Sequence, residues 1–421
     1  MNARRYRVEV KNFSKWILVL LAVVALVSVG LIACGNDEEK ETGQATTAPP
    51  TTAAPSKAAY KVGAVLSVTG AASNLGVPEK NTAEMMAAQI NSAGGINGHE
   101  LKVIIYDDES NPDKCTTLTT RLIEQDNVLA IVGPTTSGNS LAIIETVTNA
   151  KVPNVSCAAS IKIVTPVEER YWVFKTPQTD KEAVTEIYRF MQKKGITKVA
   201  LITDTSGFGS GGRAILQSDA AQYGIAIVDD QTFNSGDPSM EAQLSHIKGT
   251  DAEAVICWAT DKESATVARD MKTLKMAIPL YCSHGIANKA FIDQAGDAAN
   301  GVIFPAGKLL IIDSVPDDDP QKPVLVKYKS DYESKYGEGT INTFGGHMFD
   351  ALSMVVMALE KMPEGLSTAQ ARQFIRDEIE KIENFAGTGG VFTMSPQDHL
   401  GMQPGSLGMI EIVDGQWTQA D

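Results

Sequence analysis

The sequence contains few of the residues that metal sites, disulfide frameworks and hydrolytic centres require. Its 421 residues include five cysteines and five histidines. No two cysteines follow a CxxC spacing, and no cysteine–histidine spacing is typical of zinc ligation. The GxSxG sequence that presents a nucleophilic serine in α/β-hydrolases is also absent. These absences argue against a zinc domain and a serine hydrolase, and we expect no metal, no cofactor and no enzymatic activity.

Only one apolar run approaches the length of a membrane span, and it occupies residues 16–33. Because roughly 20 apolar residues cross a bilayer, an uncleaved anchor is one interpretation. The run follows a basic segment and ends in small residues before Cys34, which resembles a bacterial lipoprotein signal. We therefore expect residues 1–33 to be a signal peptide and Cys34 to carry a lipid. Both interpretations place the folded part outside the cytoplasm, in the periplasm or on the outer cell surface.

Positive charge is scarce in the rest of the chain. The net charge is −14, and it becomes −18 when the five basic and one acidic residues of segment 1–33 are removed. So acidic a chain is unsuited to nucleic acid, and we expect no nucleic-acid partner. Residues 34–58 are rich in Thr, Ala and Pro without apolar periodicity, which predicts a disordered tether between the lipid and the domain.

Strands and helices alternate at short spacing from residue 60 onward, which predicts an α/β protein. Apolar strands are predicted at 60–67, 101–106 and 128–132, with amphipathic helices between them. The pattern restarts with a similar strand at 198–203. This organisation indicates two doubly wound lobes, each built on a parallel sheet. Because ligands bind beyond the carboxyl ends of such strands, we expect a ligand cleft between the lobes.

A hydroxyl-rich turn at residues 132–140 (VGPTTSGNS) joins a buried strand to a helix. Such a turn presents backbone N–H groups and hydroxyl donors to one point, which suits a carboxylate or another small anion. The alternative is that Ser137 only caps the helix.

A second turn contains GxGxxG, with glycines at 207, 209 and 212. It follows a strand and opens a helix, as the dinucleotide-binding fingerprint does. A polar, longer loop in an exported protein favours instead a ligand-binding loop, with Phe208 offering a ring at the cleft.

Residues at the ends of two later strands are further candidates. His284 lies just past a strand of the second half, a position that favours the cleft, although a single histidine is commonly structural. Cys257 and Cys282 each end a predicted strand and form the best candidate disulfide. The alternative is that all the cysteines after Cys34 are small buried apolar residues.

Four segments together resemble the solute-binding proteins of ABC importers for branched-chain amino acids, the Leu/Ile/Val-binding family with the periplasmic binding protein type I fold. They are KVGAVLSVTGAASNLG, NSAGGINGHELKVIIYDDESNP, IVGPTTSG and AGDAANGVIFP. The resemblance covers roughly residues 59–420. It implies two lobes joined by a three-crossover hinge, with lobe 1 at 59–176 plus 303–385 and lobe 2 at 177–302 plus 386–421. It also implies lobe closure on the ligand and docking on a membrane permease.

The resemblance implies a set of binding residues. Ser137, Ala158 and Ser160 would hold a ligand carboxylate, and the first loop would border it. The residues expected at the ligand are Ser73, Leu75, Ser137, Ala158, Ser160, Phe208, Trp258 and His284.

The chain departs from the family at one position. Members that bind α-amino acids commonly carry an acid where His284 stands, and that acid pairs with the ligand ammonium. Asp261 is the nearest acid that could replace it. Two ligand classes therefore stay open, a branched-chain or other small amino acid and a carboxylate without an ammonium, such as an aromatic or short-chain acid. A sensor subunit is the alternative role for a protein of this kind.

Overall fold

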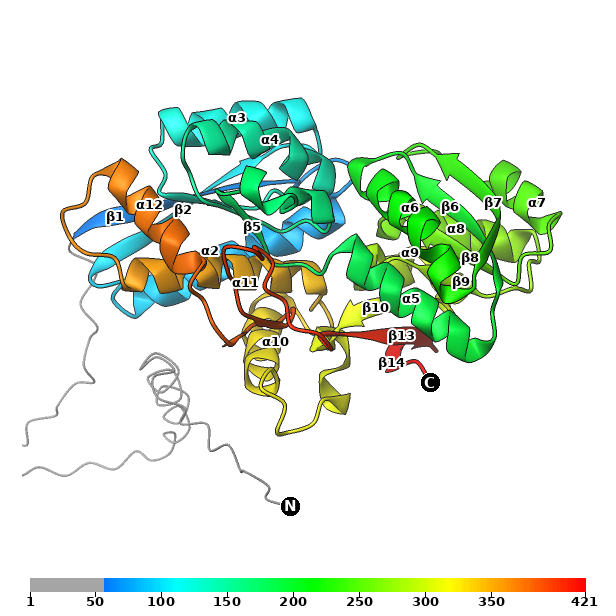
Figure 1. Cartoon of the computed structure of the whole chain (residues 1–421). Coiled ribbons are helices and arrows are strands. Elements are labelled where there is room, and N and C mark those ends of the chain that lie inside the picture. The colour runs from blue at the N-terminus through cyan, green and yellow to red at the C-terminus, as the bar shows by residue number, and fades with distance from the viewer. Residues whose placement is uncertain (1–56) are drawn as a thin grey trace, which may run out of the picture. The chain divides into compact units, whose positions relative to one another are not determined.

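The computed structural model describes residues 57–421, and Figure 1 shows their arrangement. The predicted signal peptide, Cys34 and all but the end of the tether lie outside the described residues. Two sheets, one of five strands and one of seven, organise the chain into two lobes. Within residues 57–421, no helix combines the length and the apolar character that a membrane crossing needs.

The sheet of lobe 1 is entirely parallel, with strand order β2-β1-β3-β4-β5. Its strands are β1 (Lys57–Leu66), β2 (His99–Asp107), β3 (Ala130–Val132), β4 (Asn154–Ser156) and β5 (Val173–Lys175). The helices that connect them are α2 (Ser73–Ser92), α3 (Pro112–Glu124) and α4 (Ser137–Asn149).

Helices cover both faces of this sheet. Alternate residues of each strand point to opposite faces, so each strand contributes side chains to two apolar clusters. On β1, Ala64 and Leu66 pack with one apolar cluster that includes α2 and the C-terminal helices, whereas Val65 packs with α3 and α4. The lobe is therefore doubly wound, as the sequence pattern predicts.

The sheet of lobe 2 has the order β14-β13-β10-β9-β8-β6-β7. Its strands are β6 (Lys198–Asp204), β7 (Ala226–Phe233), β8 (Ala254–Trp258), β9 (Leu280–Cys282), β10 (Ile303–Gly307), β13 (Leu407–Val413) and β14 (Gln416–Gln419). Helices α5 (Asp180–Lys194) and α6 (Gly207–Asp219) cover one face. Helices α7 (Glu241–Lys248), α8 (Asp261–Thr273) and α9 (Lys289–Ala295) cover the other.

The C-terminal third of the chain returns to lobe 1 before it ends in lobe 2. Helix α10 (Lys322–Tyr336) packs beside α2, while α11 (Thr343–Glu360) and α12 (Thr368–Ile379) join the core of the first sheet (Figure 1). The short strands β11 (Phe385–Ala386) and β12 (Val391–Phe392) stay with that core. The chain thus crosses between lobes three times, after β5, after β10 and before β13.

These crossings differ from the expected lobe boundaries at two places. Strand β10 pairs with β9 and β13, so residues 303–307 belong to lobe 2 and not to lobe 1. Phe392 and Met402 lie in the core of lobe 1, so the last crossing comes after residue 402 and not at 386. The apolar sequence of a strand is compatible with either sheet, and the pairing partner decides the assignment.

The four cysteines among residues 57–421 are free and buried, which corrects the expected disulfide. Cys257 and Cys282 do lie side by side, since they are partners in the register of β8 and β9. Both sit in the apolar core of lobe 2, where burial raises the pKa of the Cys282 thiol well above its ordinary value. They behave as small apolar core residues, the alternative that the sequence left open.

The buried carboxyl of Asp350 on α11 makes the free energy of unfolding depend on pH. Asp350 accepts hydrogen bonds from the backbone N–H groups of Thr388 (2.6 Å) and Gly389 (2.8 Å), and burial raises its pKa from 3.8 to about 7. The native state therefore binds the extra proton between those values, so the free energy of unfolding falls as the pH rises from 3.8 to about 7.

We expect the variant Asp350→Asn to flatten this part of the stability curve while lowering stability overall. Chemical denaturation of both proteins between the two pKa values, at intervals of about half a pH unit, measures the slope. A variant whose stability falls with pH as steeply as that of the wild type would show that another group titrates.

Candidate ligand-binding site

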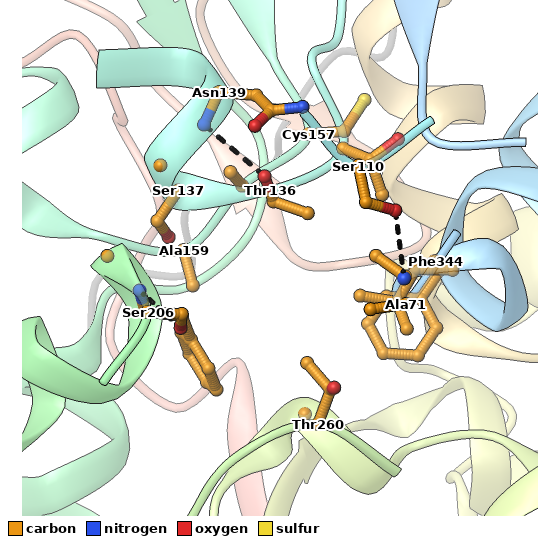
Figure 2. A pocket seen from close by; sticks show the side chains of 18 of the residues that line it. Ala71, Ser110, Thr136, Ser137, Asn139, Cys157, Ala159, Ser206, Thr260 and Phe344 are labelled. Carbon is orange, nitrogen blue, oxygen red and sulfur yellow. Dashed lines mark hydrogen bonds between the residues drawn. The ribbon is translucent and has the colours of Figure 1, made fainter. Parts of the chain in front are cut away.

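A cavity of about 260 Å³ lies between the two lobes. Its wall includes strand-end loops of both sheets, where ligands of open α/β proteins bind. Lobe 1 contributes Ser110, Thr135, Thr136, Ser137, Ala158, Ala159, Phe344 and His347, and lobe 2 contributes Asp204, Ser206, Phe208, Thr260, Glu263 and His284, among others. Ser137, Ala159 and Ser206 lie along one side, opposite Ala71 and Phe344 (Figure 2).

The lobes are closed on each other in this structure. A Cβ atom placed on Gly207 at the start of α6 would lie 2.9 Å from both the Cα and the nitrogen of Gly138 on α4. Across the same gap, the side-chain amide of Asn288 donates to the carbonyl oxygen of Asn74 at 2.6 Å. Backbone therefore meets backbone between the two helix N-termini. This approach requires glycine at 207, whereas a Cβ on Gly138 would lie an ordinary 4.0 Å from the Gly207 nitrogen.

The hydroxyl-rich turn is held in place by buried side chains. The Asp108 carboxylate accepts from the hydroxyl of Ser67 and from the side-chain amide of Asn139, each at 2.7 Å. Thr135 donates its hydroxyl proton to the buried carboxyl of Glu79, whose pKa burial raises well above its ordinary value. These hydrogen bonds fix the conformation of the turn between β3 and α4 without a ligand.

Thr136, and not Ser137, is the N-cap of α4. Its hydroxyl accepts from the backbone N–H of Asn139 at 3.3 Å (Figure 2), and Ser137 is the first helical residue. The alternative in which Ser137 only caps the helix is therefore wrong. The Ser137 hydroxyl instead accepts from the backbone N–H of Ser160 at 3.2 Å, which leaves its own proton to donate.

The backbone N–H groups on the cavity wall that have no acceptor among residues 57–421 include three close to the hydroxyl-rich turn or at the start of α6. These three belong to Ser137 at the start of α4, Gly207 at the start of α6, and Ala159 after β4. Unpaired N–H groups at helix N-termini attract anions through their partial positive charge. Since one helix comes from each lobe, an anion here would bind both lobes together.

Of the residues expected from lobe 1, Leu75, Ser137 and Ala158 line the cavity. The N–H of Ala158 donates to the Ser156 hydroxyl at 3.1 Å, so the available N–H at this point is that of Ala159. Ser160 is buried outside the cavity wall, where it positions Ser137. Ser73 begins α2 and is half-buried away from the wall.

Of the residues expected from lobe 2, Phe208 and His284 line the cavity, but Trp258 does not. The indole of Trp258 is fully buried behind them, with its ring centroid 5.7 Å from that of each. Asp261 is also fully buried and away from the wall, and its pKa is raised to about 6 by burial. It is therefore not the acid that would replace the missing partner of a ligand ammonium.

Several residues of the wall escaped the sequence analysis. Asp204 is the last residue of β6, so the strand-end rule could have found it. Glu263 lies in the first turn of α8, two residues after Asp261, the acid that the sequence suggested as a partner for a ligand ammonium. The sequence around Phe344 and His347 does not indicate a binding site, because α11 reaches the cleft only through the return of the chain to lobe 1.

Fold and cavity together define a two-lobed binding protein that encloses a small molecule between its lobes. Residues 59–416 match the family model described as "Periplasmic binding protein". The chain therefore belongs to the periplasmic binding protein family. It is a member of the type that includes the Leu/Ile/Val-binding proteins.

Curated and solved relatives have modest sequence identity. The leucine-, isoleucine-, valine-, threonine- and alanine-binding protein of Pseudomonas aeruginosa is 22% identical over 299 residues, which are 70% of this chain and 77% of the relative. An extracellular ligand-binding receptor from Rhodopseudomonas palustris is 26% identical with a TM-score of 0.81, covering 86% of this chain and 100% of that one. A branched-chain amino acid transporter substrate binding protein of Streptococcus pneumoniae, solved with isoleucine, has a TM-score of 0.74 at 24% identity, covering 86% and 99%.

The glycine contact between α4 and α6 generates a prediction. We expect Gly207→Ala to weaken ligand binding by at least about tenfold, or about 1.4 kcal/mol, because the added methyl would collide with the backbone of Gly138 and hold the lobes apart. The readouts are titration calorimetry and small-angle X-ray scattering with the carboxylate that most stabilises the wild-type protein.

Gly408→Ala is the matched control, since no atom lies within 4 Å of a Cβ built there. It should bind and close as the wild type does. Equal affinities for the wild type and Gly207→Ala would show that the contact is dispensable for closure.

Proposed function

We propose that the protein is the extracytoplasmic solute-binding component of an ABC uptake system. It binds a small carboxylate-bearing solute between its lobes, closes over it, and delivers it to a membrane permease. The observation that carries this proposal is the group of unpaired N–H donors from both lobes, at Ser137, Ala159 and Gly207.

A carboxylate fits these donors on physical grounds. The N–H groups of α4 and α6 and the Ser137 hydroxyl supply hydrogen bonds and partial positive charge at one side of the cavity. Closure removes water from this side and so strengthens each contact. Leu75, Phe208 and Phe344 provide apolar surface for the rest of the solute.

The relatives support an amino acid or a molecule like one. Their names include leucine, isoleucine and valine as ligands, and the pneumococcal protein was solved with isoleucine. At 20–26% identity these names indicate a class of small carboxylates rather than one ligand. The same proposal includes a membrane permease as the partner of the protein. It also includes a lipid on Cys34 that holds the protein at the membrane.

A thermal-shift screen against amino acids and simple organic acids tests the proposal, because a bound ligand raises the melting temperature by mass action. We expect at least one carboxylate to stabilise the wild type. Ser137→Ala should weaken the binding of that ligand by at least about tenfold, since a hydroxyl donor to a charged group contributes about 1.5–3 kcal/mol.

Ser334→Ala is the control, because this exposed serine of α10 bonds only to the neighbouring Asp331 carbonyl oxygen and should leave the shift unchanged. If no carboxylate stabilises the wild-type protein, the proposed function is wrong.

The proposed anchor makes a separate prediction. We expect Cys34→Ser to move the protein from the membrane fraction to the soluble fraction, because the thiol is the site of lipid attachment. Fractionation with metabolic fatty-acid labelling measures this. A variant that stays in the membrane with its full length would favour an uncleaved apolar anchor.

A further inference from the structure

His284 is a buried imidazole whose ring nitrogens have no partner. Its side chain is 4% exposed and lines the cavity, and neither Nδ1 nor Nε2 bonds to any of residues 57–421. Phe208 and Trp258 meet it edge-on, with ring centroids 5.2 and 5.7 Å away. Buried polar atoms are nearly always paired, so the ligand is the remaining candidate for the partner.

The surroundings of His284 disfavour a positively charged partner. Burial, with smaller contributions from the nearby His347 and Lys175, lowers the pKa of His284 to about 3, so the ring is neutral at physiological pH. Lys175 is fully buried, donates to the carbonyl oxygens of Pro177 and Gln178, and has no carboxylate in salt-bridge contact within the described chain. Glu182, Asp180 and Asp398 balance the charge of Lys175 only at longer range, so a ligand ammonium beside His284 would face a positive group that has no carboxylate in contact with it.

The two acids of the wall do not change this conclusion, because each already accepts hydrogen bonds within lobe 2. The carboxylate of Asp204 accepts from the backbone N–H of Ser206 at 2.8 Å, before α6. The carboxylate of Glu263 accepts from the N–H of Gly236 at 3.3 Å and from the hydroxyl of Thr260 at 3.2 Å, at the start of α8. A carboxylate near a helix N-terminus is also stabilised by the helix dipole in the absence of a ligand cation.

His284 is connected to the anion site through Phe208. Phe208 follows Gly207 directly, and its ring contacts His284, so the imidazole and the donors of the anion site line the same cavity with only Phe208 between them in the chain of contacts. A neutral imidazole has one N–H donor and one nitrogen acceptor. A hydroxyl group can satisfy both, and a carbonyl can satisfy the donor.

We propose that His284 selects a carboxylic acid with a hydroxyl or oxo group on carbon 2, and excludes the corresponding 2-amino acid. This inference rests on the proposed function, since it needs the carboxylate to be bound at the turn of Ser137. It narrows the solute from small carboxylates in general to 2-hydroxy and 2-oxo acids.

Matched acids test the selectivity directly. Titration calorimetry compares leucine, 2-hydroxy-4-methylpentanoate, 4-methyl-2-oxopentanoate and 4-methylpentanoate, which differ only at carbon 2. A second set with a phenyl side chain (phenylalanine, 3-phenyllactate, phenylpyruvate and 3-phenylpropanoate) allows for a larger solute. We expect the hydroxy or oxo acid of at least one set to bind at least tenfold more tightly than its amino acid.

Two variants test whether His284 causes the selectivity for hydroxy and oxo acids. His284→Leu should reduce the preference over the unsubstituted acid to less than about threefold while that acid still binds, and His284→Gln should keep part of the preference because an amide also donates and accepts. His246→Leu is the control, since the imidazole of His246 is 68% exposed on α7. Circular dichroism checks that each variant is folded, and His284→Gln alone decides the point if His284→Leu does not fold.

The outcomes separate the two proposals. A wild-type protein that binds the amino acid more tightly overturns the role of His284 and leaves the proposed function standing. Hydroxy- and oxo-acid selectivity that survives in His284→Leu also overturns it. If no acid of either set binds, and no carboxylate of the thermal-shift screen does, the proposed function itself fails.

Discussion

The structure depends on the meeting of two helix N-termini, α4 from lobe 1 and α6 from lobe 2, at Gly138 and Gly207. Both helix ends carry partial positive charge, so bringing them together without an anion is unfavourable. A carboxylate between them would cancel this repulsion and accept their unpaired N–H groups. Ligand binding and lobe closure would then be one event, because the N–H groups of the two helices meet only when the lobes are closed.

The rest of the fold keeps these helix ends in position. Buried carboxyl groups at Glu79 and Asp108 fix the turn before α4, and Asp350 fixes the segment that leads back to lobe 2. At the first crossing, Thr176 donates to the carbonyl oxygen of His347 on α11. Rigid lobes joined by three chain crossings allow hinge motion while each half of the cavity keeps its shape.

Charge within the cavity is distributed unevenly, and this affects which ligands the cavity can bind. The acids Asp204 and Glu263 accept hydrogen bonds within lobe 2, while neither ring nitrogen of His284 has a partner among residues 57–421. Relatives with names that specify amino acids share the fold at low identity. Ligand class in such a scaffold follows from a few side chains on the wall, and the fold alone does not decide it.

The sequence by itself determined the alternation of strands and helices, the doubly wound lobes and the placement of Ser137, Phe208 and His284 at strand ends, because these follow from short-range apolar patterns and parallel topology. Only the tertiary structure decided that β10 pairs in lobe 2, that Trp258 stands behind the wall, and that His347 reaches it. Those facts depend on which distant segments pack together, and a local pattern holds no information about a partner some hundred residues away.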